Sequence, residues 1–113
     1  MTKSWMMLAV VSLISAPAMA KEPAIHPAVV SDPAPDAAYP AAMHAFVIPA
    51  QNGAMNAVLY TATGPGLHPT LLLLHGFPGN EQNLDLAQAA RRAGWHVLTL
   101  HYRGSWGSPG AFS

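Results

Sequence analysis

Two short apolar runs separated by a helical segment constrain the fold more than any other feature of this sequence. The first run, Thr70–Leu74, ends at His75-Gly76, and the second spans Trp95–Tyr102. Short continuous runs of this kind are typical of strands that are buried on both faces of a parallel sheet. A strand, a helix and a strand within about thirty residues form a βαβ unit. We therefore expect an α/β fold with a mostly parallel sheet.

The segment between the two runs carries helix signals. Either Asn80 or Asn83 could cap the N-terminus of the helix. Two arginines fall in its last turn, where cations complement the helix dipole, and Gly94 follows as a candidate C′ residue. The residues that recur at helical spacing, and so predict the inner face, are Leu86, Ala89, Ala90 and Ala93.

A β-hairpin is expected before the first apolar run. Residues Ala45–Ile48 and Asn56–Thr63 are both of β type. Between them lies Asn52-Gly53, a dipeptide that tolerates positive φ and therefore favours a turn. The spacing predicts an antiparallel hairpin with a loop longer than the minimal one.

The first twenty residues have the pattern of a secretory signal peptide. Lys3 supplies a positive charge, Trp5–Ile14 is apolar, and Ala18-Met19-Ala20 is a cleavage site of the A-x-A type. A membrane-spanning helix needs ~20 apolar residues, and this run is shorter. We predict cleavage after Ala20 and a periplasmic or secreted protein that meets the membrane only transiently, during export.

Residues 21–42 form a Pro/Ala-rich linker, and we place the folded part at 43–113. Five prolines lie in the linker, at positions 23, 27, 33, 35 and 40. Each proline removes a backbone donor and disfavours helix at the residue before it. We therefore expect an extended, poorly ordered segment here.

Composition excludes several classes of function. The formal net charge is zero, so no electrostatic argument favours binding to nucleic acid. The chain has no cysteine, which excludes disulfides and thiolate zinc sites. The six histidines show no HxH or HxxxH spacing, so we expect neither a metal site nor a cofactor.

A glycine-containing loop follows each of the two apolar runs. The first is His75-Gly76-Phe77-Pro78-Gly79, and the second is Arg103–Gly110, with the sequence RGSWGSPG. In their order and spacing, these loops and the helix between them resemble the α/β-hydrolase superfamily. The resemblance covers roughly Phe46 to Ser113. It implies the N-terminal portion of that fold, incomplete, with a β-hairpin followed by one βαβ unit.

The resemblance also implies roles for residues of the two loops. The backbone N–H of Phe77 would be an oxyanion-hole donor, with His75 and Gly76 shaping the turn. Arg103 and Gly104 would be structural. From the residues alone, Gly76 has two explanations: a glycine lets a substrate approach the backbone closely, or the chain needs a glycine merely to turn.

The residues that do the chemistry in that family are missing from this chain. No G-x-S-x-G occurs, and no Asp or Glu follows Asp85. Neither Ser105 nor Ser108 lies in a nucleophile motif, and we interpret His96 and His101 as packing residues. The expectation is a truncated chain without nucleophile, acid or catalytic histidine, and therefore inactive by itself.

The leading functional hypothesis is a fragment of an exported serine hydrolase, of esterase or peptidase type, acting by acyl transfer. Its substrate would be a small molecule or a peptide that binds the full-length parent. Two alternatives remain open at this point. One is an Asp-nucleophile hydrolase of the epoxide hydrolase or dehalogenase type. The other is a short, non-catalytic binding module.

Overall fold

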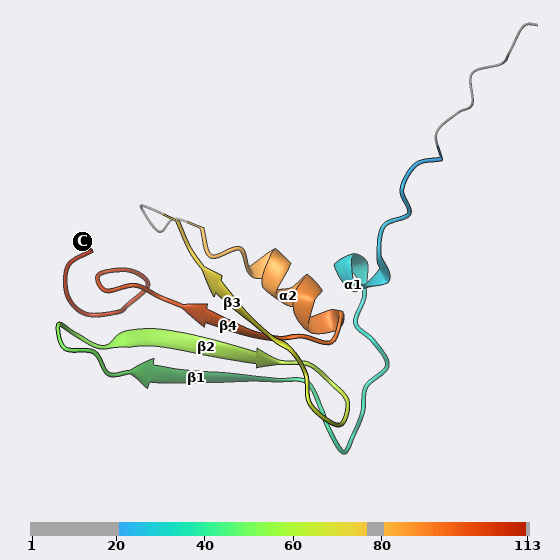
Figure 1. Cartoon of the computed structure of the whole chain (residues 1–113), viewed down its shortest axis with the longest axis horizontal. Coiled ribbons are helices and arrows are strands. Elements are labelled where there is room, and N and C mark those ends of the chain that lie inside the picture. The colour runs from blue at the N-terminus through green and yellow to red at the C-terminus, as the bar shows by residue number, and fades with distance from the viewer. Residues whose placement is uncertain (1–20, 77–80, 113) are drawn as a thin grey trace, which may run out of the picture.

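The computed structural model describes residues 21–76 and 81–112, and it has a four-stranded mixed sheet and two helices (Figure 1). The predicted signal peptide, and the loop residues from Phe77 to Asn80, lie outside the described residues. The α/β class expected from the sequence is confirmed at this level. In chain order the elements are α1 (Pro27–Val30), β1 (Ala42–Ile48), β2 (Met55–Thr61), β3 (Thr70–Leu74), α2 (Leu84–Arg92) and β4 (His96–Leu100).

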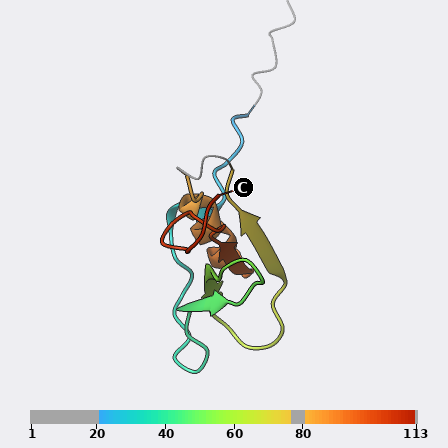
Figure 2. The same cartoon turned by 90° about the vertical axis from the view of Figure 1, so that its left-hand side faces the viewer.

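The strands are arranged in the order β1-β2-β4-β3, which places β3 at one edge of the sheet (Figure 2). Strands β1 and β2 form the predicted antiparallel hairpin, and β3 pairs with β4 in parallel, as a βαβ unit requires. Strand β2 pairs with β4 antiparallel. The expectation of a mostly parallel sheet is therefore wrong for the described strands, because the hairpin contributes two of the four.

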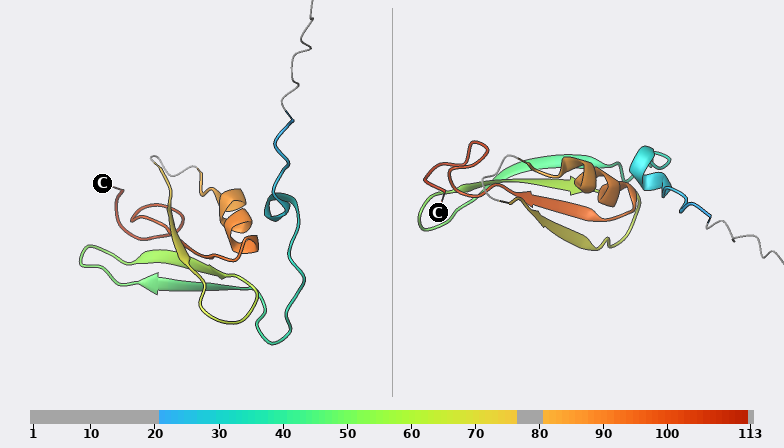
Figure 3. Two further views of the ribbon diagram at one scale, coloured as in Figure 1. Left: turned by 45° about the vertical axis from the view of Figure 1, so that its right-hand side comes forward. Right: turned by 90° about the horizontal axis from the view of Figure 1, so that it is seen from above.

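Helix α2 covers one face of the sheet, and the small core lies beneath it (Figure 3). Side chains on a strand alternate between faces, so Val97 and Thr99 of β4 share a face. Both are buried, as is Ala87 of α2. A side chain as small as that of Ala87 lets the helix approach the strands closely.

No helix within the described residues covers the opposite face of the sheet (Figure 3). The strand register places Leu72, Leu98 and Leu59 in one row across this face, and Leu74 and Leu100 in the next. Leu72 is 53% exposed and Leu74 is 46% exposed. The Thr70–Leu74 run is therefore not buried on both faces among the described residues, and its burial in a complete sheet stays a prediction. Among residues 21–76 and 81–112, β3 has one neighbouring strand and no helix packs on this side of it.

Both ends of α2 lie where the sequence predicted them, but the N-terminus lacks the expected side-chain cap. Asn83 occupies the N-cap position, as one of the two predicted alternatives, but it has a left-handed φ of 53° and makes no side-chain cap hydrogen bond. Both arginines do lie in the last turn, and Gly94 takes a φ of 97° just past the helix. The predicted inner face is wrong at Leu86 and at Ala93, which are both exposed. Successive helix residues point about 100° apart, and the helix turns the adjacent Ala87 toward the sheet.

The segment before β1 contacts α2 rather than standing free (Figure 1). Its prolines do not prevent a short helix, because Pro27 occupies the first turn of α1, where a missing N–H costs nothing. The Asp32 carboxylate lies 2.6 Å from Arg91 and 3.1 Å from Arg92. Hydrogen bonds from Arg91 and then Arg92 hold the pKa of Asp32 below its usual value. The expectation of an extended segment is therefore wrong over Pro27–Val30. In the described residues no helix is long and apolar enough to cross a membrane.

Candidate functional site

The two glycine-containing loops follow the carboxyl ends of β3 and β4, and so lie at the same end of the sheet. Strands β3 and β4 are parallel and pair Leu74 with Leu100, so their carboxyl ends lie side by side. His75 and Gly76 follow β3, and the loop from His101 to Phe112 follows β4. Ligands of α/β proteins bind at this end of the sheet. Phe77, the predicted oxyanion donor, lies outside the described residues, so its N–H has no position in this geometry.

His75 joins the ends of the two strands. Its Nε2 accepts a hydrogen bond from the backbone N–H of Tyr102 at 3.2 Å. Its Nδ1 lies 3.1 Å from the carbonyl oxygen of Gly76, which can only accept. The two partners together assign the proton to Nδ1 and make this imidazole neutral. The ring is buried and lies 4.3 Å, centroid to centroid, from the ring of Tyr102.

Gly76 is not required by the conformation of the described chain. Its φ is not among the positive values of the glycines. A Cβ placed on it would meet no described atom within 4 Å outside its two chain neighbours. Of the two explanations for this glycine, the need merely to turn therefore receives no support from the surrounding atoms.

Gly104 is in the opposite situation. Its φ is 74°, and a Cβ on it would lie 2.5 Å from the backbone nitrogen of Phe112. Its N–H donates to the carbonyl of Ser108 at 3.1 Å and to that of Pro109 at 3.2 Å. The loop after β4 therefore folds back on itself around this residue. This geometry gives Gly104 a structural role.

Ser108 anchors the same loop to the sheet. Its hydroxyl accepts from the N–H of Asn56 at 2.9 Å and donates to the carbonyl of His101 at 2.9 Å. Both serines of the loop are buried. Across residues 21–76 and 81–112, no hydrogen bond joins either hydroxyl to a histidine ring or a carboxylate. Neither Ser105 nor Ser108 is therefore placed to act as an activated nucleophile.

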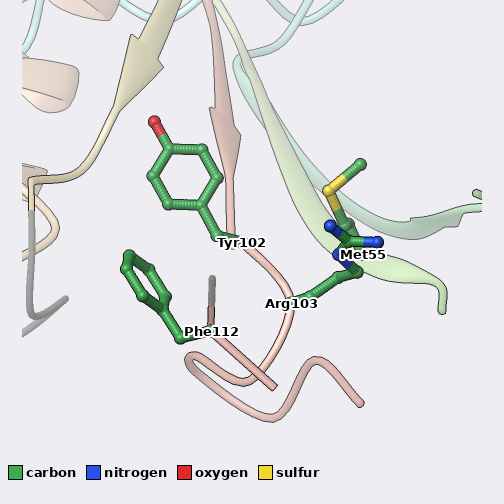
Figure 4. Close-up of a pocket in the computed structure, with 4 residues that line it drawn as sticks. All are labelled: Met55, Tyr102, Arg103 and Phe112. Atoms are coloured by element: carbon green, nitrogen blue, oxygen red, sulfur yellow. The ribbon is translucent and has the colours of Figure 1, made fainter. Parts of the chain in front are cut away.

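Arg103 lines a pocket of about 240 Å³ beside His75 (Figure 4). The other lining residues are Met55, Tyr102 and Phe112, and the two aromatic rings lie 6.0 Å apart. A Cβ on Gly53 would lie 3.7 Å from Cδ of Arg103, so the arginine stem packs along backbone there. Nothing in the spacing of the sequence predicted that Met55 would join this site, because it comes from the distant strand β2, and Phe112 joins it because the loop after β4 folds back.

The remaining histidines of the predicted strand serve packing and hydrogen bonding. Nδ1 of His101 is buried, with no hydrogen-bond partner in the part of the chain that is described. Burial lowers the pKa of His101. His96 accepts a hydrogen bond at Nδ1 from the N–H of Ala62, 3.1 Å away.

The site contains no set of metal ligands. No group of three His, Asp or Glu side chains in the described ranges could hold a metal ion. What the two strands bring together is a neutral histidine, an open glycine, a closed glycine loop and an arginine-lined pocket. In comparisons with known proteins, no family model, no curated protein and no solved structure matches this chain.

Proposed function

We propose that this chain is the N-terminal part of an exported α/β-hydrolase, a serine hydrolase that cleaves an ester or amide by acyl transfer. One observation carries the proposal. The turn at His75-Gly76 and the loop at Arg103–Gly110 leave the carboxyl ends of two adjacent parallel strands. The resembled family has its oxyanion loop at this position.

In this proposal the turn after β3 supplies part of the oxyanion hole. Phe77 would donate its backbone N–H to the negative oxygen of the tetrahedral intermediate. The space beside Gly76 supports this role, because a substrate carbonyl could approach the backbone there. The hydrogen bond from Tyr102 to His75 holds the start of the turn against β4, which supports a structural link between the two loops of the site.

The nucleophile, the acid and the catalytic histidine would come from a segment that follows Ser113. Two features of the sheet support such a segment. Strand β3 has a free hydrogen-bonding edge, and the leucine face beside it is covered by no described helix. In the resembled fold, the strand leading to the nucleophile pairs with this edge. Parallel sheets are normally covered on both faces.

The experiment that tests the proposal begins with the gene beyond codon 113. We expect an open frame with a β-type run, a G-x-S-x-G motif, and then an acid and a histidine. The protein from the complete gene should hydrolyse a p-nitrophenyl ester, and alanine at the elbow serine should abolish turnover. An Asp at the elbow would instead indicate the epoxide hydrolase type of chemistry. A stop codon directly after Ser113 would contradict the proposal and favour a binding module.

Residues 1–113 expressed alone should not hydrolyse the same ester above a boiled control. The single oxyanion donor has no attacking group beside it, so it has little to stabilise. Turnover that Ser105→Ala or Ser108→Ala removed would contradict both the proposal and the structural role of the second loop. Export is tested separately by N-terminal sequencing of periplasmic material, in which we expect Lys21 as the first residue.

A further inference from the structure

His68 lies between two backbone carbonyl groups at the opposite end of the β3–β4 pair from the candidate site. Its Nδ1 is 2.8 Å from the carbonyl oxygen of Gly94, and its Nε2 is 3.0 Å from that of Gly64. Carbonyl oxygens only accept hydrogen bonds, so both ring nitrogens must donate. A neutral imidazole carries one N–H and an imidazolium carries two, so this geometry is that of a protonated histidine.

The ring of His96 lies beside the ring of His68, and Nδ1 of His96 must stay unprotonated to accept a hydrogen bond. Its ring lies 4.8 Å from the ring of His68, centroid to centroid. Its Nδ1 accepts from the N–H of Ala62 at 3.1 Å, so that nitrogen carries no proton. Protonation of Nδ1 would break this hydrogen bond and place a second cation beside the first. The pair is therefore arranged to hold the positive charge on His68.

The surrounding groups supply partial charges rather than an anion. Within the described residues, no carboxylate forms an ion pair with His68 or His96. The arginines in the last turn of α2 bond to Asp32. Gly94 follows the C-terminus of α2, where the helix dipole favours a cation. The hydrogen bonds to Gly64 and then to Gly94 raise the pKa of His68, and burial opposes them more weakly.

We propose that these two hydrogen bonds form a pH-dependent clamp, which ties the loop between β2 and β3 to the turn between α2 and β4 while His68 is protonated. Loss of the proton leaves one ring nitrogen facing a carbonyl with no hydrogen between them, so one of the two bonds must break. The clamp belongs to the fold and does not depend on the proposed hydrolase activity.

The direction of the pH dependence follows from the sign of the pKa shift. The ordinary pKa of the histidine is 6.5, and the folded protein raises it. The clamp is therefore fully present below 6.5 and is lost as the pH rises through the higher, folded value. An exported protein experiences the pH of its surroundings directly, so the clamp would loosen in alkaline medium.

Opening should be confined to the tip of the loop. The N–H of Gly64 bonds to the carbonyl of Tyr39 at 2.9 Å, and the N–H of His96 bonds to the carbonyl of Pro69 at 2.9 Å. These two bonds hold the ends of the loop whatever the state of His68. The segment free to move is Pro65 to His68, in which Leu67 is fully exposed.

The test uses the protein expressed from its complete gene, labelled with ¹⁵N in histidine. At pH 6 we expect both ring nitrogens of His68 to carry protons. Cleavage by chymotrypsin after Leu67 should become at least threefold faster between pH 6 and pH 8.5, relative to a short reference peptide. His68→Phe should be cleaved quickly at both pH values. His44→Phe, which changes an exposed histidine on β1, should behave like the unchanged protein.

Two results would overturn the clamp. One is a His68 ring with a single protonated nitrogen at pH 6. The other is a His68→Phe protein whose cleavage shows the same pH ratio as the unchanged protein. If His68→Phe failed to fold, the NMR titration of the unchanged protein would still show whether both ring nitrogens of His68 are protonated at pH 6.

Discussion

Gly76 and Gly104 each follow the end of a strand in the same parallel pair, and their surroundings differ. Around Gly104 the backbone of residues 110–112 fills the space that a side chain would need. Beside Gly76 the described chain leaves that space open. Both glycines belong to motifs with the same resemblance, yet the chain itself accounts for one of them only. The described part of the loop after β4 therefore folds around its glycine, whereas no described atom outside the chain neighbours of Gly76 limits the space beside it.

The largest effect on stability is expected for Gly104→Ala. The new Cβ would overlap the backbone nitrogen of Phe112 at 2.5 Å, and the residue would also have to hold a φ of 74°. Backbone overlap and left-handed φ together should lower the free energy of unfolding by about 3 kcal/mol. Urea unfolding of the protein from the complete gene measures this.

Gly107→Ala is the matched control for that experiment. Gly107 has a φ of 78°, but its Cβ would meet only a side-chain nitrogen of Asn56, at 3.4 Å. It therefore carries the φ strain without the backbone overlap and should cost about 1 kcal/mol. Equal losses for the two variants would show that the β4 loop is not closed around Gly104.

The second-largest loss in the free energy of unfolding is expected for Ser108→Ala. The substitution removes one hydroxyl and leaves both the N–H of Asn56 and the carbonyl of His101 without this partner. Unpaired buried groups of this kind should cost about 2 kcal/mol. Ser105→Ala removes a similarly buried hydroxyl for which the described residues show no side-chain hydrogen bond, and we expect a much smaller loss. A reversed order in urea unfolding would mean that Ser105 anchors the loop.

The third-largest loss of stability is expected for His75→Phe. This variant tests the hydrogen bond between His75 and Tyr102, which joins the two loops. Phenylalanine keeps a ring beside Tyr102 but cannot accept its backbone N–H. We expect a loss of about 1 kcal/mol in the free energy of unfolding. His101→Phe is the control, because Nδ1 of His101 has no partner among the described residues. If His101→Phe cost as much as His75→Phe, ring replacement and not the hydrogen bond would explain the loss.

The sequence predicted the elements of this fold better than their surroundings. Strand β3 begins and ends where the Thr70–Leu74 run does, because a continuous apolar run with a glycine after it is a local signal. The burial of the same leucines is not a local property, since it depends on which segments cover the strand. The hydrogen bond of Ser108 to Asn56 joins residues 52 positions apart. No spacing rule reaches across such a distance.

At Asn83, too, the residue type alone did not predict the hydrogen bonds of the side chain. Its residue type favours an N-cap, but capping needs an extended backbone, and Asn83 is held at a φ of 53°. The histidines were also underestimated from the sequence. His75 and His68 were assigned, respectively, a turn-shaping role and no role, and each makes hydrogen bonds at both ring nitrogens. Ring nitrogens find partners through the fold, so their roles follow from the three-dimensional arrangement.

The smallest effect on stability, and the sharpest test of the comparison, is expected for Gly76→Ala. The added Cβ meets no described atom within 4 Å and needs no positive φ, so the free energy of unfolding should change by less than about 0.5 kcal/mol.

If the proposed hydrolase function is correct, the same methyl group would stand where the substrate carbonyl approaches. Misplacement of a substrate by about 1 Å can lower a rate by a factor on the order of 10². We therefore expect kcat/KM for the ester to fall at least tenfold, by an order-of-magnitude estimate, while urea unfolding stays unchanged. A stable variant with full activity would remove Gly76 from the site. A destabilised variant would mean that this glycine, like Gly104, serves the chain itself.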